Sequence, residues 1–197
     1  MPKRKLIPLV LALFIGVLMG VWILSATTPP NRGDDIGGSF ELVDQTGDVR
    51  SETLFKGHWS ALFFGFTHCP DICPTTLVTL ADVQRTLEDQ VELSVVFVSV
   101  DPERDSPEVL KDYLASDGLP VGTIGLTGSP EAIDHMTKIW RVYAQKAGDG
   151  EDYNVDHSSV VYLVAPDGKV SAVGSASESA QTMADKFRRA IETNARL

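Results

Sequence analysis

Residue types that commonly build metal and redox sites are scarce in this chain of 197 residues. Cysteine occurs twice and methionine four times. Two cysteines are too few for a disulfide-rich scaffold, and a chain of this length with 43% hydrophobic residues forms a core without one. The methionines, at positions 1, 19, 136 and 183, are far apart, so the sequence contains no methionine cluster that would store a soft metal.

Positive charge is also in short supply. The chain has 17 basic and 27 acidic residues, and without the three basic residues at positions 3–5 the balance is 14 against 27, a charge of −13. This balance excludes the basic footprint of a nucleic-acid-binding protein. An acidic surface suits a cationic partner or a metal, and it is equally typical of a well-solvated protein.

A long hydrophobic run covers residues 6–26. Its 21 residues carry no charge and are long enough to cross a hydrocarbon core about 30 Å thick as one helix. The hydrophobic region of a cleaved signal peptide is shorter, about 7 to 15 residues. In addition, Leu24 stands where cleavage after Ala26 would need a small residue. We therefore predict an uncleaved transmembrane anchor.

The charges on either side of this run predict its orientation. Three basic residues precede it, whereas Arg32 beyond it is followed by two aspartates. Because basic residues stay in the cytoplasm, we expect residues 1–5 to be cytoplasmic and the remainder to be exported. The sequence thus predicts a single-pass inner-membrane protein with its C-terminal domain on the periplasmic side. Residues 27–37, rich in proline and glycine, read as a linker to a domain over residues 38–195.

Hydrophobic periodicity and turn signals predict the elements of that domain. We expect a β-hairpin over 39–50, buried strands over 60–66 and 91–100, a helix with Pro74 in its first turn, helices over 106–116 and 129–140, a second hairpin over 158–174 and a last helix over 178–193. A parallel strand pair joined by a helix, followed by an antiparallel hairpin and a closing helix, is the order of an α/β, thioredoxin-like domain.

Both cysteines lie in "FGFTHCPDICPTT", residues 64–76, where a predicted strand meets a predicted helix. A structural disulfide here would close a very short loop and so would stabilise the fold little. A thioredoxin-type exchange motif has two residues between its cysteines, whereas three separate Cys69 from Cys73. The helix start favours a thiolate, and two thiolates suit Cu(I), or zinc if two more ligands are present. Redox exchange and metal binding therefore both remain open.

Four histidines could complete a metal site. His58, beside a strand entrance, and His135, in a predicted helix, are expected to be ordinary surface or packing residues. His68 is adjacent to Cys69 and can point away from the thiols. His157, in "NVDHSS" just before a predicted central strand, is the remaining candidate.

Three motifs, "FGFTHCPDICP", "VSVDPERDSPE" and "VDHSS", resemble the signatures of the Sco/SenC family of copper proteins, over roughly residues 36–193. The resemblance implies a thioredoxin-like fold on a single membrane anchor, with copper bound by Cys69, Cys73 and His157. It also implies delivery of copper to the dinuclear copper site of cytochrome c oxidase subunit II, and a possible upstream copper donor. The motifs bring Asp71, Asp101 and Asp156 near the site without assigning them a role.

This resemblance favours a membrane-anchored copper chaperone over an enzyme. Two alternatives stay open, because the dithiol alone does not separate them from the chaperone. One is a thiol-disulfide reductase that keeps the cysteines of an oxidase subunit reduced, and the other is a copper-responsive redox sensor. A peroxidase is disfavoured, since no dedicated base for a peroxidatic cysteine is evident.

Overall fold

The computed structural model describes residues 36–148, 150 and 153–196. The predicted anchor over 6–26 and residues 27–35 of the predicted linker lie outside these ranges. Within them, no helix is both long and apolar enough to cross a membrane. Along the chain the elements are β1 (Glu41–Asp44), β2 (Val49–Ser51), η1 (Glu52–Phe55), β3 (Trp59–Gly65), α2 (Ile72–Leu87), β4 (Leu93–Ser99), α3 (Pro107–Leu114), β5 (Ile124–Thr127), α4 (Pro130–Ile139), β6 (Ala144–Ala147), β7 (Asn154–His157), β8 (Val160–Val164), β9 (Val170–Ser175) and α5 (Ala180–Asn194).

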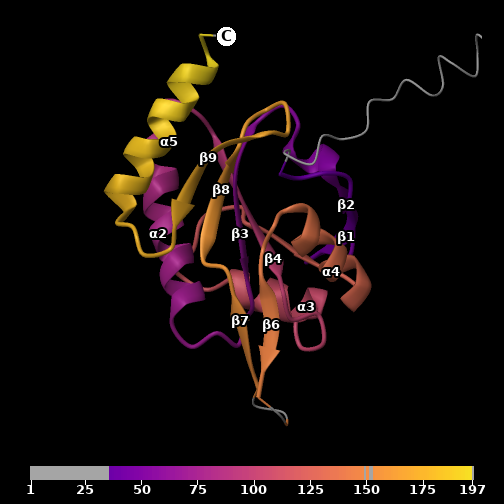
Figure 1. The fold of residues 1–197 in the computed structure, drawn as a ribbon. Coiled ribbons are helices and arrows are strands. Elements are labelled where there is room, and N and C mark those ends of the chain that lie inside the picture. The colour runs from indigo at the N-terminus through magenta and orange to yellow at the C-terminus, as the bar shows by residue number, and fades with distance from the viewer. Residues whose placement is uncertain (1–35, 149, 151–152, 197) are drawn as a thin grey trace, which may run out of the picture. The chain divides into compact units, whose positions relative to one another are not determined.

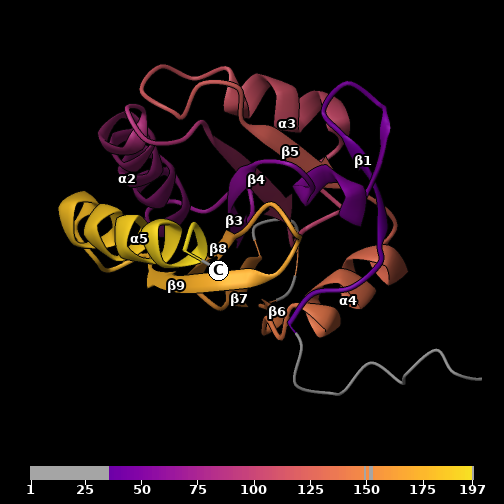
Figure 2. The same cartoon turned by 90° about the horizontal axis from the view of Figure 1, so that it is seen from above.

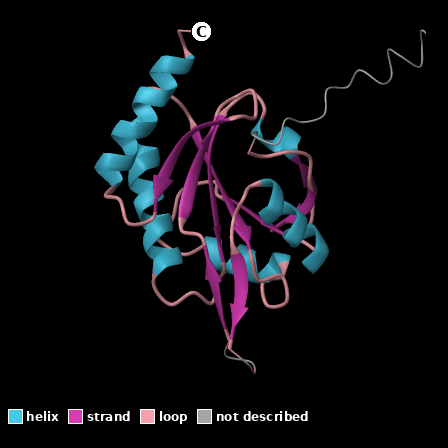
Figure 3. Ribbon diagram, in the orientation of Figure 1, coloured by secondary structure: helices cyan, strands magenta, loops and turns pink. Residues whose placement is uncertain are grey.

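A seven-stranded mixed sheet forms the centre of the domain, in the order β2-β1-β5-β4-β3-β8-β9 (Figures 1 and 3). The strands β3, β4 and β5 run parallel, and β1 and β8 pair antiparallel on either side of them. Every residue of β3 is buried, because helices cover both faces of the sheet at its centre. Figure 2 shows α2, α3 and α5 on one face and α4 on the other. This arrangement is a mixed α/β, thioredoxin-like fold, as predicted.

Most predicted elements are confirmed within a few residues. Three helices follow a serine whose hydroxyl accepts the backbone N–H three residues later, and two of these serines, Ser106 and Ser129, are the first residues of the helices predicted over 106–116 and 129–140. The helix predicted around Pro74 is α2, and its apolar residues at helical spacing, including Leu77 and Leu80, are buried.

Hydrophobic periodicity did not predict β5 or the antiparallel ribbon made by β6 and β7. These are four-residue strands, and "AQKA" of β6 lacks the apolar alternation that identifies a strand. The ribbon matters for the site because His157 is its last residue. Among the described residues, β6 and β7 pair only with each other (Figure 1).

Candidate metal centre

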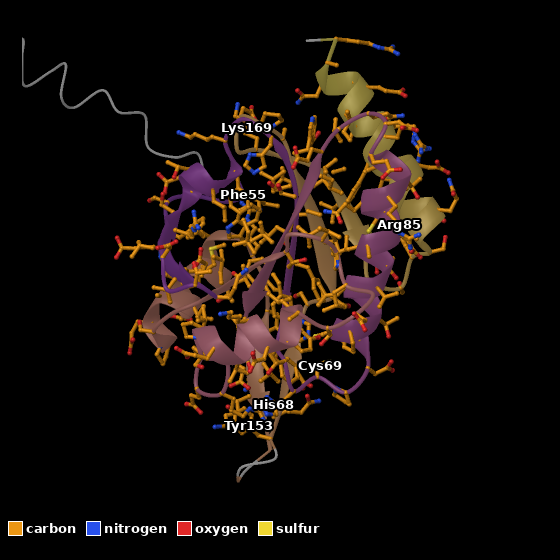
Figure 4. All side chains as sticks on the ribbon, turned by 180° about the vertical axis from the view of Figure 1, so that it is seen from behind. Phe55, His68, Cys69, Arg85, Tyr153 and Lys169 are labelled. Carbon is orange, nitrogen blue, oxygen red and sulfur yellow. The ribbon has the colours of Figure 1, made fainter. Side chains whose placement is uncertain are left out.

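The two cysteines lie at the carboxyl end of the parallel strands, the usual place for sites in open α/β sheets. Cys69 is in the loop that follows β3, where its backbone N–H donates to the Phe66 carbonyl at 3.3 Å. Cys73 is the second residue of α2 and is fully buried, whereas Cys69 is 9% exposed. Both thiols are free. Figure 4 shows Cys69 and His68 at one end of the domain and Phe55 and Lys169 at the other.

Gly65, the last residue of β3, allows Cys73 to approach the sheet. A Cβ at this position would stand 2.8 Å from the Cys73 sulfur and 2.8 Å from the Phe97 ring. Real Cβ atoms do not come this close to their neighbours, so a side chain here would displace the thiol. The glycine of "FGF" is therefore part of the site's construction.

His157 reaches the site from β7, 84 residues further along the chain. Its Nε2 lies 3.5 Å from the Cys73 sulfur, and its Nδ1 lies 3.1 Å from the Ser158 carbonyl oxygen. A carbonyl only accepts hydrogen bonds, so Nδ1 carries the proton and Nε2 presents its lone pair to the sulfur. The rings of Phe63 and Phe66 meet the imidazole edge-on at 6.2 and 5.8 Å and help to fix its plane.

The two sulfur atoms and the imidazole nitrogen all lie within 4.8 Å of one another. With bonds of about 2.3 Å to sulfur and 2.0 Å to nitrogen, as in zinc sites, two donors at a near-tetrahedral angle are about 3.5 Å apart. The distance from Cys73 to His157 matches this value. In the described part of the chain, the only cluster that could hold a metal consists of these three residues, so a closed four-ligand zinc site is not formed there. Two thiolates and one imidazole suit copper.

Protonation of the donor atoms follows from burial. Burial raises the pKa of the Cys73 thiol well above its usual value, and the Phe66 backbone N–H only partly offsets this. The position at a helix start predicts a thiolate here, but burial keeps the pKa of the thiol raised in the metal-free protein. Burial also lowers the pKa of His157, against the opposing effects of Ser158 and Asp156. Metal-free His157 is therefore neutral, and the Cys73 S–H group donates a hydrogen bond to Nε2.

A pocket of about 280 Å³ gives access to the site from solvent. Cys69 and His157 line it, whereas Cys73 does not and lies behind them. Asp71 and Asp156 also line it and are exposed, so the entrance is acidic. An incoming ligand therefore meets Cys69 before Cys73.

The remaining histidines are outside this cluster, as expected. His68 is half-exposed, and its Nδ1 lies 3.1 Å from the Thr67 hydroxyl. His135 donates from Nε2 to the Ser39 carbonyl at 3.0 Å. His58 precedes β3, at the opposite end of that strand from the cysteine loop.

Sequence reasoning missed the side chains that hold the loops of the site together. Asp105 is fully buried and accepts hydrogen bonds from the backbone and hydroxyl of Thr67 and from the hydroxyl of Ser99, so it ties the ends of β3 and β4 together. Asp101, which was expected near the site without a role, is buried and bonded to Arg104 and Tyr153. The alternation of apolar and polar residues in "YNVDH" was the one sequence signal that could have placed Tyr153 on the buried face of a strand.

Comparison with known proteins gives one family. A family model described as SCO1/SenC matches residues 28–192. The mitochondrial protein SCO2 homolog of Bos taurus is 43% identical over 157 residues, which are 77% of this chain and 58% of the bovine protein. The chain thus spans less than two thirds of that relative's length.

Solved structures agree with the family match. The crystal structure of Arabidopsis thaliana ScoI with copper bound has a TM-score of 0.76 and 37% identity, covering 80% of this chain and 99% of that one. BsSco, a member of the Sco family of cytochrome c oxidase assembly proteins in which a disulfide switch was identified, has a TM-score of 0.64 and 27% identity, covering 80% and 93%.

Proposed function

The chain belongs to the SCO1/SenC family, and on that premise we propose that it is a copper-binding protein of cytochrome c oxidase assembly. Its ligands are Cys69, Cys73 and His157. The observation that carries this proposal is the convergence of two thiols and one imidazole nitrogen within 4.8 Å, from segments 84 residues apart. Bound copper would supply a soft ion that ligands of a partner can take over.

We further propose that the protein is a chaperone that delivers copper to the dinuclear copper site of cytochrome c oxidase subunit II, after loading by an upstream donor. The position of the donors supports transfer by ligand exchange. Cys69 and His157 face the open pocket, so a partner's thiol can replace them while Cys73 still holds the ion from behind. Residues 6–26 would anchor the chain in the inner membrane, with the domain on the periplasmic side.

Metal content under defined redox conditions tests copper binding. Because thiolates are the ligands, the reduced domain should bind one copper ion, and a disulfide between Cys69 and Cys73 should abolish binding. Cys69→Ser and Cys73→Ser should each lose tight Cu(I) binding, measured by competition with a chromophoric chelator. Full copper binding by the oxidised domain would contradict the proposal.

A thiol-disulfide reductase is the second candidate, since the two free thiols are close enough to oxidise to a disulfide. Cells that lack the protein separate the two functions. Added copper should restore oxidase activity if the defect is delivery, whereas an added small thiol should restore it if the defect is reduction. Rescue by the thiol and never by copper would favour the reductase.

A further inference from the structure

The ribbon that carries His157 is attached to the rest of the domain at few points. Among the described residues, β6 and β7 have no strand partner in the seven-stranded sheet. At its base the two ends of the ribbon are bonded to each other, since Ser158 donates its backbone N–H to the Tyr143 carbonyl at 2.9 Å and accepts the Tyr143 N–H at its hydroxyl at 3.0 Å. A pocket of about 200 Å³ is lined by residues of the ribbon, of α4 and of the loop after β4. Contacts at the far end of the ribbon therefore matter for its position.

Tyr153, one residue before β7, makes such contacts. It is 8% exposed, and its hydroxyl donates to the buried Asp101 carboxylate at 2.5 Å. The Arg104 guanidinium and the Lys146 ammonium lie 3.6 and 3.7 Å from its ring centroid, in the range of cation–π attraction. Lys146 belongs to β6 and also pairs with Glu103 at 3.0 Å. Both strands of the ribbon are thus tied to the loop after β4.

These contacts are connected to His157 through the strand itself. Tyr153 and Val155 are buried and His157 is half-buried, whereas Asn154 and Asp156 are exposed. Successive side chains of a strand point to opposite faces, so the first three share the inward face. A rise of about 3.3 Å per residue places His157 about 13 Å beyond Tyr153 on the same strand.

Arg104 provides a second connection to the imidazole. Besides stacking on Tyr153, its guanidinium lies 5.9 Å from the Phe66 ring centroid. Phe66 in turn meets His157 edge-on at 5.8 Å, with an angle of 86° between the ring planes. A shift of Tyr153 therefore reaches His157 through packed side chains as well as through the strand.

We propose that Tyr153 is a positioning residue of the metal centre. By clamping the far end of the ribbon to Asp101 and Arg104 in the loop after β4, with Lys146 of β6 packed on its ring, it keeps the inward face of β7 toward the cysteine loop and brings Nε2 of His157 to the Cys73 sulfur. This inference rests on the proposed function in that it takes His157 as a copper ligand. Cys69 and Cys73 belong to a different segment, so the clamp acts on the nitrogen donor and leaves the dithiol in place. Figure 4 shows Tyr153 and Cys69 at the same end of the domain.

Copper titrations of two variants test the clamp. Tyr153→Phe removes the hydroxyl that donates a hydrogen bond to Asp101. Lys146→Gln removes a cation from the face of the Tyr153 ring and leaves the buried Asp101 carboxylate unchanged. Residues that orient a metal ligand commonly contribute on the order of 10 to 100-fold to metal affinity. We expect each variant to weaken Cu(II) by about tenfold or more, and to leave Cu(I) within about threefold because two thiolates suffice for it. Electron paramagnetic resonance of the Cu(II) form should show reduced coupling to the imidazole nitrogen.

Tyr143→Phe is the matched control. Tyr143 precedes β6 and is 56% exposed, and its hydroxyl donates to Gln145, so this variant removes an equivalent hydroxyl from the ribbon without touching the clamp. It should behave like the unmodified protein. The proposal is overturned if Tyr153→Phe and Lys146→Gln keep the Cu(II) affinity and nitrogen coupling of the control, or if they weaken both oxidation states equally.

A measurement without metal separates this proposal from the function on which it rests. Amide hydrogen exchange of the reduced, metal-free domain should accelerate in β6 and β7 of Tyr153→Phe and stay unchanged in β3 and β4. If the unmodified domain binds no copper, the proposed function fails, yet this exchange pattern still tests whether Tyr153 holds the ribbon. Unchanged ribbon exchange together with unchanged copper binding would overturn the clamp alone.

Discussion

At the scale of single residues, a proton and a metal ion compete for the same atoms of the site. In the metal-free protein, the buried Cys73 thiol donates a hydrogen bond to Nε2 of His157, and that nitrogen is also the proposed third ligand. Copper binding must therefore displace the proton from the Cys73 sulfur and use the lone pair of His157 Nε2 that accepts its hydrogen bond. The Ser158 carbonyl keeps Nδ1 protonated throughout, so the imidazole needs no tautomer change to switch partners.

The raised pKa of Cys73 predicts a pH-dependent stability of the reduced, metal-free domain. The unfolded thiol ionises near its usual pKa of 9.0, whereas the folded thiol stays protonated to higher pH. The folded state then binds the additional proton, so its stabilising contribution is complete below about pH 9 and is lost as the pH rises, by about 1.4 kcal/mol per pH unit. Urea unfolding of the wild type should therefore fall more steeply between pH 8.5 and 10, in about that proportion, than unfolding of Cys73→Ser. Parallel curves for the two proteins would contradict the prediction.

His157→Ala should separate the two oxidation states of copper. Cu(I) is held by two thiolates, whereas Cu(II) prefers a tetragonal site with nitrogen or oxygen donors, so the variant should lose on the order of 10 to 100-fold in Cu(II) affinity and much less in Cu(I) affinity. Competition titrations in both states measure this. His58→Ala and His135→Ala are controls, because neither side chain belongs to the cluster. If His157→Ala matched them for Cu(II), the imidazole would be only a packing group.

At the scale of elements, the junction between β3 and α2 places the buried thiol. Gly65→Ala should push Cys73 and the Phe97 ring away, because the new Cβ would lie 2.8 Å from atoms of both. Overpacking of this kind costs about 1 to 3 kcal/mol. We expect a lower midpoint in urea unfolding and weaker binding of both copper oxidation states, since the displaced group is a thiol.

Gly174→Ala, in β9, is the control for the Gly65 variant. The three atoms nearest to its Cβ would all belong to the flexible Met183 side chain, at 3.2 Å or more. It should leave copper affinity unchanged even if stability falls slightly. Equal copper affinities for the two glycine variants would show that the close approach at Gly65 is not needed for the site.

Sequence patterns predicted the elements whose own residues indicate burial or a helix start. The runs around β3 and β4 are mostly apolar, and the Ser-Pro-Glu starts of α3 and α4 combine a cap, a proline and an acid. The ribbon could not be predicted in this way. Of its eight strand residues only Val155 is buried, and its position depends on Tyr153 meeting Asp101, 52 residues away. Local periodicity cannot predict a tertiary contact between residues so far apart in the sequence.

The residues of the metal centre likewise differ in how far local sequence predicted them. The spacing of Cys69 and Cys73 at a strand-helix junction indicated metal or redox chemistry directly. His157 became the favoured third residue only through the resemblance of "VDHSS" to a family motif, because a lone histidine carries little information by itself. The structure adds the groups that orient these three side chains, among them Gly65, Asp105 and Tyr153, and packing alone reveals them.

At the scale of the whole molecule, the described residues from Ile36 onward form one compact unit with its own core. Its first residues are fixed to α4, because the Gly37 N–H donates to the Ile139 carbonyl at 2.9 Å and the Ser39 carbonyl accepts from His135. A domain that starts at Ile36 keeps both hydrogen bonds. The sequence before it contains the uncharged run over 6–26 that we propose as a membrane anchor.

Fractionation of cells tests this division of the chain. Because 21 uncharged residues can span a bilayer, the full chain should stay in the membrane fraction after washing at alkaline pH. The domain starting at Ile36 should be soluble and should bind copper without the preceding residues. Protease added to the periplasmic side of spheroplasts should degrade the domain, since the basic residues before the anchor keep the N-terminus in the cytoplasm. Replacing Leu13 and Val17 with Arg inside the run should release the full chain from the membrane, because each charge at mid-membrane costs about 2.5 to 3.5 kcal/mol. Recovery of the unmodified protein in the soluble periplasmic fraction, with a new N-terminus near Thr27, would instead identify residues 6–26 as a cleaved signal.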